Sequence, residues 1–161
     1  GFDLGNSPLE YTAEMVMGRT LIFASTNGSK TLLACSDAYE VFIGGFINMP
    51  SLINEVRHAE KLLLVCSGKL GRFSLEDTIC AGMIIDELIR IGKKPVLQSD
   101  SAVCARWLFG RYVSAPDETL ASAEHPTYLS QNLGLIEDVA FCTQIGSHTI
   151  VPRYSKGVVN L

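Results

Sequence analysis

Residues 61–91, KLLLVCSGKLGRFSLEDTICAGMIIDELIRI, contain the pattern that decides the fold. The run 61–66 (KLLLVC) is almost uniformly apolar, which is typical of a central strand covered on both faces of a sheet. A loop over 68–73 separates this strand from 74–91, where a Ser cap, an acidic first turn and the following Gly92 predict the longest helix of the chain. A strand, a loop and a long helix in this order predict an α/β fold.

The same alternation is present before this stretch. Residues 20–25 (TLIFAS) and 40–46 (EVFIGGF) are further predicted strands, followed by predicted helices over 29–38 and 50–60. Strands that alternate with helices predict a mostly parallel or mixed sheet with helices packed on it, in α/β/α layers. We therefore expect a single α/β domain over residues 1–161.

The last third of the chain changes character. Residues 100–144 predict three shorter helices, broken around Pro116, Pro126 and Gly134, and the terminal HTIVPRYSKGVVNL predicts two short strands around a Ser-Lys-Gly turn, returning to the sheet edge.

Three side chains in these helices carry specific expectations. Trp107 and Phe109 are predicted to be core anchors, the usual position of large aromatic residues on a helix. His125 precedes a proline at a helix boundary, so a capping or packing role is predicted for it ahead of catalysis.

Composition limits the possible partners and compartments. The 161 residues are 47% hydrophobic and 19% charged, with a net charge of −4 and no basic run, which argues against a nucleic-acid partner. The longest apolar runs are too short to span a membrane, so a soluble protein is expected. Five cysteines, an odd number at wide spacing, indicate reduced thiols and a cytoplasmic location.

Two loops follow predicted strands, where ligands gather in such sheets. In the first, the hydroxyls of Ser25 and Thr26, the amide of Asn27 and the backbone around Gly28 can form an anion cradle at a helix start. The Walker spacing of a P-loop is absent. The alternative is an Asn-Gly turn followed by a helix cap.

The second loop leads into the longest predicted helix. Ser74, Glu76 and Asp77 can be explained as a cap and an acidic first turn alone. That explanation leaves Arg72 without a role, although its guanidinium suits a phosphate or sulfonate group. Two carboxylates beside a bound phosphate would repel it unless Mg²⁺ bridged them, so this helix start also fits a metal-bridged phosphate.

The first twelve residues, GFDLGNSPLEYT, contain turn chemistry and give the impression of a chain that begins within a fold. This segment, with STNG, GGFIN, SGKLGRFSLEDTICAG, HPTYLSQNLGLIEDVAFCTQ and the IVP segment, closely resembles the 2-phosphosulfolactate phosphatases of coenzyme M biosynthesis. The resemblance covers nearly the whole chain, in order. It implies hydrolysis of 2-phospho-3-sulfolactate to 3-sulfolactate and phosphate, with a requirement for Mg²⁺.

The resemblance also implies which residues form the site. From their chemistry we expect Asp3, Glu76 and Asp77 to be the catalytic residues and to hold the metal or its bound water. The mechanism we expect is attack of a metal-activated water on phosphorus, with a phosphoryl-aspartate intermediate as an open alternative. The expected substrate-binding residues are Asn6, Ser7, Ser25, Thr26, Asn27, Gly28, Arg72 and Ser74.

Two departures from the family pattern leave alternatives open. Family members have a further N-terminal segment with an additional strand, so these residues are expected to form the larger, C-terminal part of the family fold. The stretch 144–148 also has no acidic residue where members have one. A related metal-dependent hydrolase for another small anionic phosphoester, or a non-catalytic binding relative, are the alternatives. Homo-oligomerisation is possible through an open sheet edge.

Overall fold

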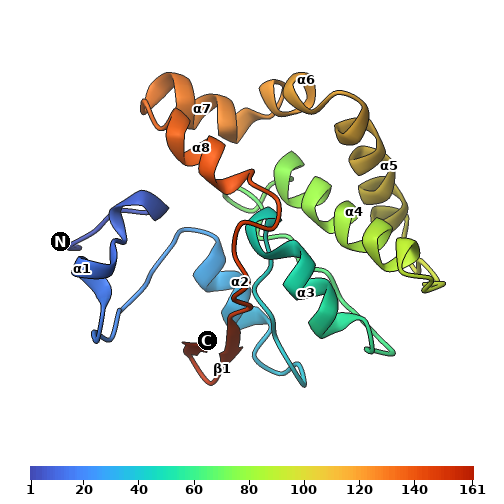
Figure 1. The fold of residues 1–161 in the computed structure, drawn as a ribbon, viewed down its shortest axis with the longest axis horizontal. Coiled ribbons are helices and arrows are strands. Elements are labelled where there is room, and N and C mark those ends of the chain that lie inside the picture. The colour runs from blue at the N-terminus through green and yellow to red at the C-terminus, as the bar shows by residue number, and fades with distance from the viewer.

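Helices dominate the fold (Figure 1). The computed structural model describes residues 1–161, apart from the side chain of Asp117. Helices α3, α4 and α5 lie side by side, and α6, α7 and α8 curve back towards the start of α4. The elements in chain order are the 3₁₀ helix η1 (Pro8–Glu10), α1 (Ala13–Val16), α2 (Gly28–Ala34), the 3₁₀ helix η2 (Phe46–Asn48), α3 (Met49–Val56), α4 (Leu75–Arg90), α5 (Asp100–Ser114), α6 (Pro116–Ala121), α7 (Glu124–Asn132), α8 (Ile136–Cys142), β1 (Arg153–Ser155) and β2 (Val158–Asn160).

Helix α4 confirms the central prediction from the sequence. The Ser74 hydroxyl caps it by accepting a hydrogen bond from the backbone N–H of Asp77. After the helix, Gly92 adopts a φ of 86°, a left-handed conformation that favours glycine. Local signals set both ends of this helix, which explains why the sequence predicted them well.

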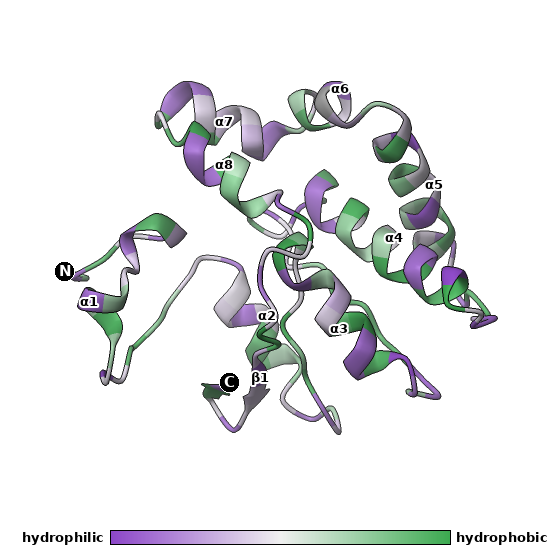
Figure 2. Cartoon of the chain, in the orientation of Figure 1, coloured by the Kyte–Doolittle hydropathy of each residue, from purple (hydrophilic) through white to green (hydrophobic). Residues whose placement is uncertain are grey.

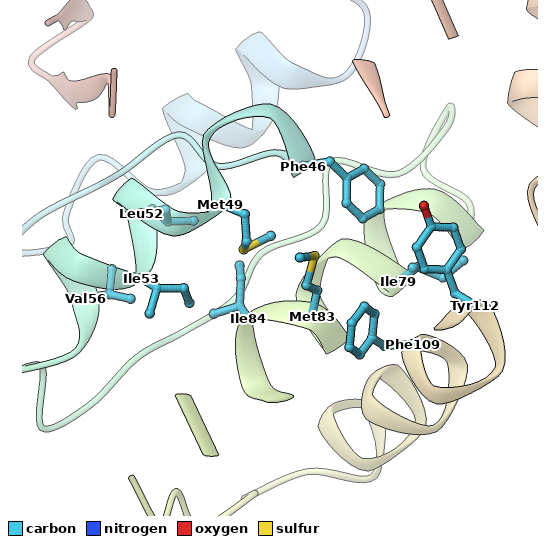
Figure 3. Packing of buried hydrophobic residues seen from close by; sticks show 10 residues of the cluster. All are labelled: Phe46, Met49, Leu52, Ile53, Val56, Ile79, Met83, Ile84, Phe109 and Tyr112. Carbon is cyan, nitrogen blue, oxygen red and sulfur yellow. The ribbon is translucent and has the colours of Figure 1, made fainter. Parts of the chain in front are cut away.

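The core lies between η2, α3, α4 and α5 (Figure 3). Met49 and Ile79 are its most deeply buried large side chains, at 1% and 0% exposure. Phe46 and Tyr112 stack with their ring centroids 5.8 Å apart, which ties η2 to α5. Phe109 is buried as predicted, but Trp107 is 72% exposed, so the prediction of a core role for Trp107 was wrong. The two positions lie on different faces of α5, because residues two apart point in different directions around a helix.

Asn48 fastens the C-terminal part of the chain to the segment before η2. Its side chain is buried; the amide nitrogen donates to the carbonyls of Ile43 and Ile150 at 3.1 and 3.0 Å, and the amide oxygen accepts from Gly45 N–H at 2.9 Å. Tyr154 N–H then donates to the carbonyl of Val41 at 2.9 Å. Segments that are about a hundred residues apart in the sequence are thereby held side by side.

The predicted C-terminal strand pair is confirmed. Strands β1 and β2 pair antiparallel with Tyr154 opposite Val159. Lys156 and Gly157 between them have φ values of 50° and 83°, the positive angles that a tight two-residue hairpin turn requires. The hairpin lies beside 41–43 through an isolated bridge between Phe42 and Arg153.

The layered sheet is where the structure departs from the sequence prediction. Among the described residues β1 and β2 are the only strands, and they are antiparallel. The predicted strands over 20–25, 40–46 and 61–66 are not formed, apart from the isolated bridge at Phe42. Much of the segment between α1 and α2 is nevertheless hydrophobic (green in Figure 2). Ile22 and Leu63 are 89% and 83% exposed. An apolar run predicts an extended backbone, whereas a strand also needs a hydrogen-bonded partner that the run does not specify.

The helical prediction for 100–144 was right in kind and wrong in number, since four helices, α5 to α8, occupy this stretch. Pro126 does not break the chain but lies in the first turn of α7, where a proline costs no helical hydrogen bond. The break falls one turn earlier, at Ser122 and Ala123. Within the described part of the chain, no helix is long and apolar enough to cross a bilayer.

Candidate active site

The loop before α4 is a tight turn. Lys69 and Arg72 exchange two backbone hydrogen bonds, of 3.1 Å from Lys69 N–H and 3.0 Å from Arg72 N–H. The two residues between them, Leu70 and Gly71, have φ values of 53° and 75°. A turn with two positive φ angles fixes the directions of its flanking residues, so the turn places the cations Lys69 and Arg72 at neighbouring positions.

Asp77 connects this turn to the helix. Its Oδ2 accepts a hydrogen bond of 2.8 Å from the backbone N–H of Gly68. Gly68 has a φ of 68°, and a Cβ at this position would lie 2.5 Å from the carbonyl oxygen of Arg72, so a side chain is excluded there. The carboxylate of Asp77 thus holds the turn against the N-terminus of α4.

The two loops singled out in the sequence meet in the structure. The Asn27 side-chain oxygen accepts a hydrogen bond of 2.9 Å from Leu70 N–H. Ser25 and Ser29 bond each other reciprocally, each hydroxyl accepting from the other residue's backbone N–H at 2.8 and 3.1 Å. The Asn27 side chain therefore links the two loops. It makes no capping hydrogen bond to α2, which begins at the next residue.

A carboxylate from α7 reaches the cations of the turn. Glu124 Oε1 lies 2.9 Å from Lys69 Nζ and 3.6 Å from Arg72 Nη2. The hydrogen bond and charge of Lys69, followed by the charge of Arg72, lower the pKa of Glu124. Arg72 was expected to bind phosphate or sulfonate, and in the structure a protein carboxylate lies beside it.

A cavity of about 200 Å³ lies beside this ion pair, between the start of α4 and the junction of α6 with α7. Ser74 and Glu76 line one side of it, and Ser122 and His125 line the other. The Nδ1 atom of His125 is buried and has no hydrogen-bond partner among the described residues. Polar atoms of this kind call for an explanation, because burial without a partner costs free energy.

The N-terminal candidates lie elsewhere in the molecule (Figure 1). Ser7 donates a hydrogen bond of 3.0 Å to Oδ1 of Asp138, a carboxylate on α8 that is only 8% exposed. Gly5 and Tyr11 close the segment on itself through a bond of 2.7 Å from the Tyr11 hydroxyl to the Gly5 carbonyl. Asp3 is exposed. The structure thus connects Ser7 to α8, and it does not assemble Asp3 with Glu76 and Asp77.

No group of three or more His, Cys, Asp or Glu side chains among the described residues is arranged to hold a metal ion. Mg²⁺, however, is commonly held by only one or two carboxylates together with water and substrate phosphate. Glu76 and Asp77 supply that number. The bond from Gly68 uses only part of the accepting capacity of the Asp77 carboxylate, which has about four lone-pair positions.

Sequence reasoning missed four residues that the structure brings to these sites: Lys69, Glu124, Asp138 and the buried face of His125. Lys69 and Glu124 are 55 positions apart, and Ser7 and Asp138 are 131 positions apart. Neither pair belongs to one local motif. Lys69, His125 and Asp138 fall within stretches that resemble the family, whereas Glu124 lies just before one of them.

The cysteines near the site are poor nucleophiles. Burial raises the pKa of Cys80 to about 12, with further contributions from the negative charges of Asp77 and Cys66. Burial also raises the pKa of Cys66, again assisted by Asp77. Because the thiolate is the reactive form, both side chains stay protonated and unreactive near neutral pH.

This protonation predicts a labelling pattern. With iodoacetamide at about pH 8, the exposed Cys104 should be alkylated at least about tenfold faster than Cys80, as measured by mass spectrometry of the digested protein. Raising the pH to about 10 should leave Cys80 protonated, because its pKa lies higher. In urea the two rates should converge. Equal rates in the folded protein would contradict the burial of Cys80.

The comparison with known sequences identifies the family. The chain matches the sequence profile of the 2-phosphosulpholactate phosphatases over residues 1–157. It belongs to the 2-phosphosulfolactate phosphatase family. The predicted resemblance is thereby confirmed, and it includes both loops and the start of α4.

Several members of the 2-phosphosulfolactate phosphatase family are similar along the whole chain. A probable 2-phosphosulfolactate phosphatase from Symbiobacterium thermophilum is 39% identical, over 100% of this chain and 69% of its own length. Proteins described in the same words from Caldanaerobacter subterraneus and Thermotoga petrophila are 33% and 35% identical, over 99% and 98% of this chain and 65% and 66% of theirs. The chain therefore spans about two thirds of the length of these relatives.

Proposed function

We propose that the protein containing this chain hydrolyses 2-phospho-3-sulfolactate to 3-sulfolactate and inorganic phosphate. One observation carries the proposal: in a chain of this family, two loops and an acidic helix start are joined by the Asn27–Leu70 and Gly68–Asp77 hydrogen bonds. They bring hydroxyls, cations and carboxylates to one place. A small substrate with several anionic groups needs such a mixture.

Each part of this arrangement has a proposed role. The loop 25–28 and Ser74 donate hydrogen bonds to phosphate oxygens, and Arg72 pairs with a phosphate or sulfonate. A water oxygen attacks phosphorus, the phosphorus–oxygen ester bond breaks, and the leaving alkoxide oxygen takes a proton. In phosphoryl transfer most of the catalysis comes from positioning and charge stabilisation, so the fixed turn matters more than any single nucleophile.

The metal remains part of the proposal. Glu76 and Asp77 would hold Mg²⁺, which neutralises phosphate charge when bound. They lie at the N-terminus of a 16-residue helix, and the positive end of the helix dipole favours carboxylates there with or without a metal. Asp3 and the other N-terminal candidates, Asn6 and Ser7, are retained as proposed contributors, which the whole protein would have to bring closer.

We also propose a sheet architecture, an oligomeric state and a cellular compartment for the whole protein. The apolar runs 20–25 and 61–66 support strands of a layered α/β/α sheet in the whole protein, since strong strand formers exposed to water favour a pairing partner. The same exposed apolar runs favour a homo-oligomer. The five free cysteines support a reducing compartment such as the cytoplasm.

The test is phosphate release from 2-phospho-3-sulfolactate, measured with Mg²⁺, with a chelator, and with Mg²⁺ restored in excess. We expect release that the chelator abolishes and added Mg²⁺ recovers. Release that continues in the presence of the chelator would refute the proposed metal requirement but not the proposed hydrolase activity. Binding of the substrate without release in any condition would favour a non-catalytic relative.

A further inference from the structure

The contact between α7 and the 68–73 turn has an arrangement that binding sites for oxyanions share. One carboxylate oxygen, Glu124 Oε1, lies between two cations, 2.9 Å from Lys69 Nζ and 3.6 Å from Arg72 Nη2. An oxygen of a phosphate or sulfonate group takes the same position between an ammonium and a guanidinium in protein sites. An oxyanion that bound these two cations would therefore compete with Glu124 for them.

The Lys69 side chain is more buried than the carboxylate that it meets. The Lys69 side chain is 21% exposed, and its ammonium lies 5.3 Å from the centroid of the Tyr128 ring, one turn along α7. The Glu124 side chain is 68% exposed. Ion pairs of such exposure contribute little to stability, so a competing anion can displace this one at small cost.

The space next to this pair is suitable for a ligand. The cavity of about 200 Å³ is bounded by the Ser74 and Ser122 side chains together with Lys69 and His125. It has room for several waters or one small anion, because a water takes about 30 Å³. The cavity also borders His125, whose buried Nδ1 has no hydrogen-bond partner among the described residues.

We propose that Glu124 is an internal competitor at an oxyanion subsite formed by Lys69, Arg72 and the adjoining cavity. In the ligand-free protein its carboxylate pairs with the two cations, and a tetrahedral oxyanion group of the substrate displaces it. The assignment of that group to a phosphate or sulfonate rests on the proposed function. The subsite itself rests on the contacts of Glu124 and on the cavity.

The variant Glu124→Gln tests this competition, because it keeps the side-chain size and removes the charge. Calorimetric titration with inorganic phosphate should give a dissociation constant roughly fivefold lower than that of the unchanged protein, as expected for releasing an exposed ion pair. All samples contain Mg²⁺ at one ionic strength, since the Glu76 carboxylate also lines the cavity and salt screens these charges. Replacing phosphate with methanesulfonate then tells which oxyanion the subsite prefers.

Glu118→Gln is the matched control. Glu118 lies six positions earlier, is comparably exposed, and pairs with a single cation, Arg111, at 2.8 Å. The substitution Glu118→Gln removes the same unit of negative charge as Glu124→Gln, so a general effect of net charge would appear in both variants. A second variant, Lys69→Gln combined with Glu124→Gln, should lose the gain in affinity. The thermal unfolding midpoints of all variants are compared to confirm that each is folded.

The outcomes separate this inference from the proposed function, because phosphate binding is measured without catalysis. Tighter phosphate binding by Glu124→Gln than by Glu118→Gln, lost on adding Lys69→Gln, supports the subsite even if no phosphatase activity is found. If Glu124→Gln bound phosphate no more tightly than Glu118→Gln or the unchanged protein, the inference would be overturned, even in an active enzyme. A gain that persists without Lys69 would also overturn it.

Discussion

Asp77→Asn is expected to reduce phosphate release from 2-phospho-3-sulfolactate by at least about a hundredfold, a typical loss when one charged group that stabilises a transition state is removed. The substitution is nearly isosteric. An Asn oxygen can still accept the 2.8 Å hydrogen bond from Gly68 N–H, so the turn keeps its anchor. What is lost is the negative charge proposed to hold Mg²⁺ beside the phosphate.

The stability of this variant should change far less than its activity. A carboxylate in the first turn of a helix contributes about 0.3–1 kcal/mol to stability through the helix dipole. Asp77→Asn should lose only this contribution. Asp86→Asn is the matched control, because Asp86 lies on the same helix and pairs with Arg106 at 3.4 Å, away from the loops. Near-normal phosphate release by Asp77→Asn, or an equal loss of release in Asp86→Asn, would contradict the proposed role of Asp77 in the active site.

Gly82→Ala is expected to destabilise the protein by at least about 2 kcal/mol, the cost of overpacking a close contact. Helices α4 and α5 approach each other at Gly82, where a Cβ would lie 2.0 Å from the carbonyl oxygen of Ala105 and 2.8 Å from Cβ of Phe109. The clash involves backbone, so no side-chain rotation relieves it, and the two helices must separate.

Gly110→Ala provides the opposite expectation within the same helix pair. A Cβ at Gly110 meets no atom within 4 Å, so the substitution should stabilise α5 by about 0.5–1 kcal/mol through helix propensity. Urea denaturation of both variants measures the two effects. If Gly82→Ala were as stable as Gly110→Ala, the packing of α4 on α5 described above would be wrong.

Features that depend on neighbouring residues were predicted well. Ser74 and Gly92 mark the ends of α4, and Lys156-Gly157 marks the C-terminal hairpin, because caps and tight turns involve residues a few positions apart. The layered sheet could not be obtained in the same way. The runs 20–25 and 61–66 are strand-like in sequence, but they form no strand within the described residues.

The candidate site divides along the same line. The two loops and the acidic start of α4 were predicted from local chemistry, and the Asn27–Leu70 bond now joins them. The pairing of Lys69 with Glu124 joins residues 55 positions apart, and no local pattern relates them. Asp138 was missed for the same reason, since a carboxylate next to Val139 on a short helix gives no sign that it will accept a bond from Ser7.

We propose that this family member acts on a phosphoester that also carries a sulfonate. The most direct measurement compares the kcat/KM for phosphate release from 2-phospho-3-sulfolactate with that from 2-phospholactate, which lacks the sulfonate, using the full natural chain with Mg²⁺. We expect the kcat/KM for 2-phospho-3-sulfolactate to be higher by about tenfold or more. The smaller substrate leaves the groups that would bind the sulfonate without a partner, and this disfavours it. Equal values for the two substrates, or no release from the first, would contradict the account.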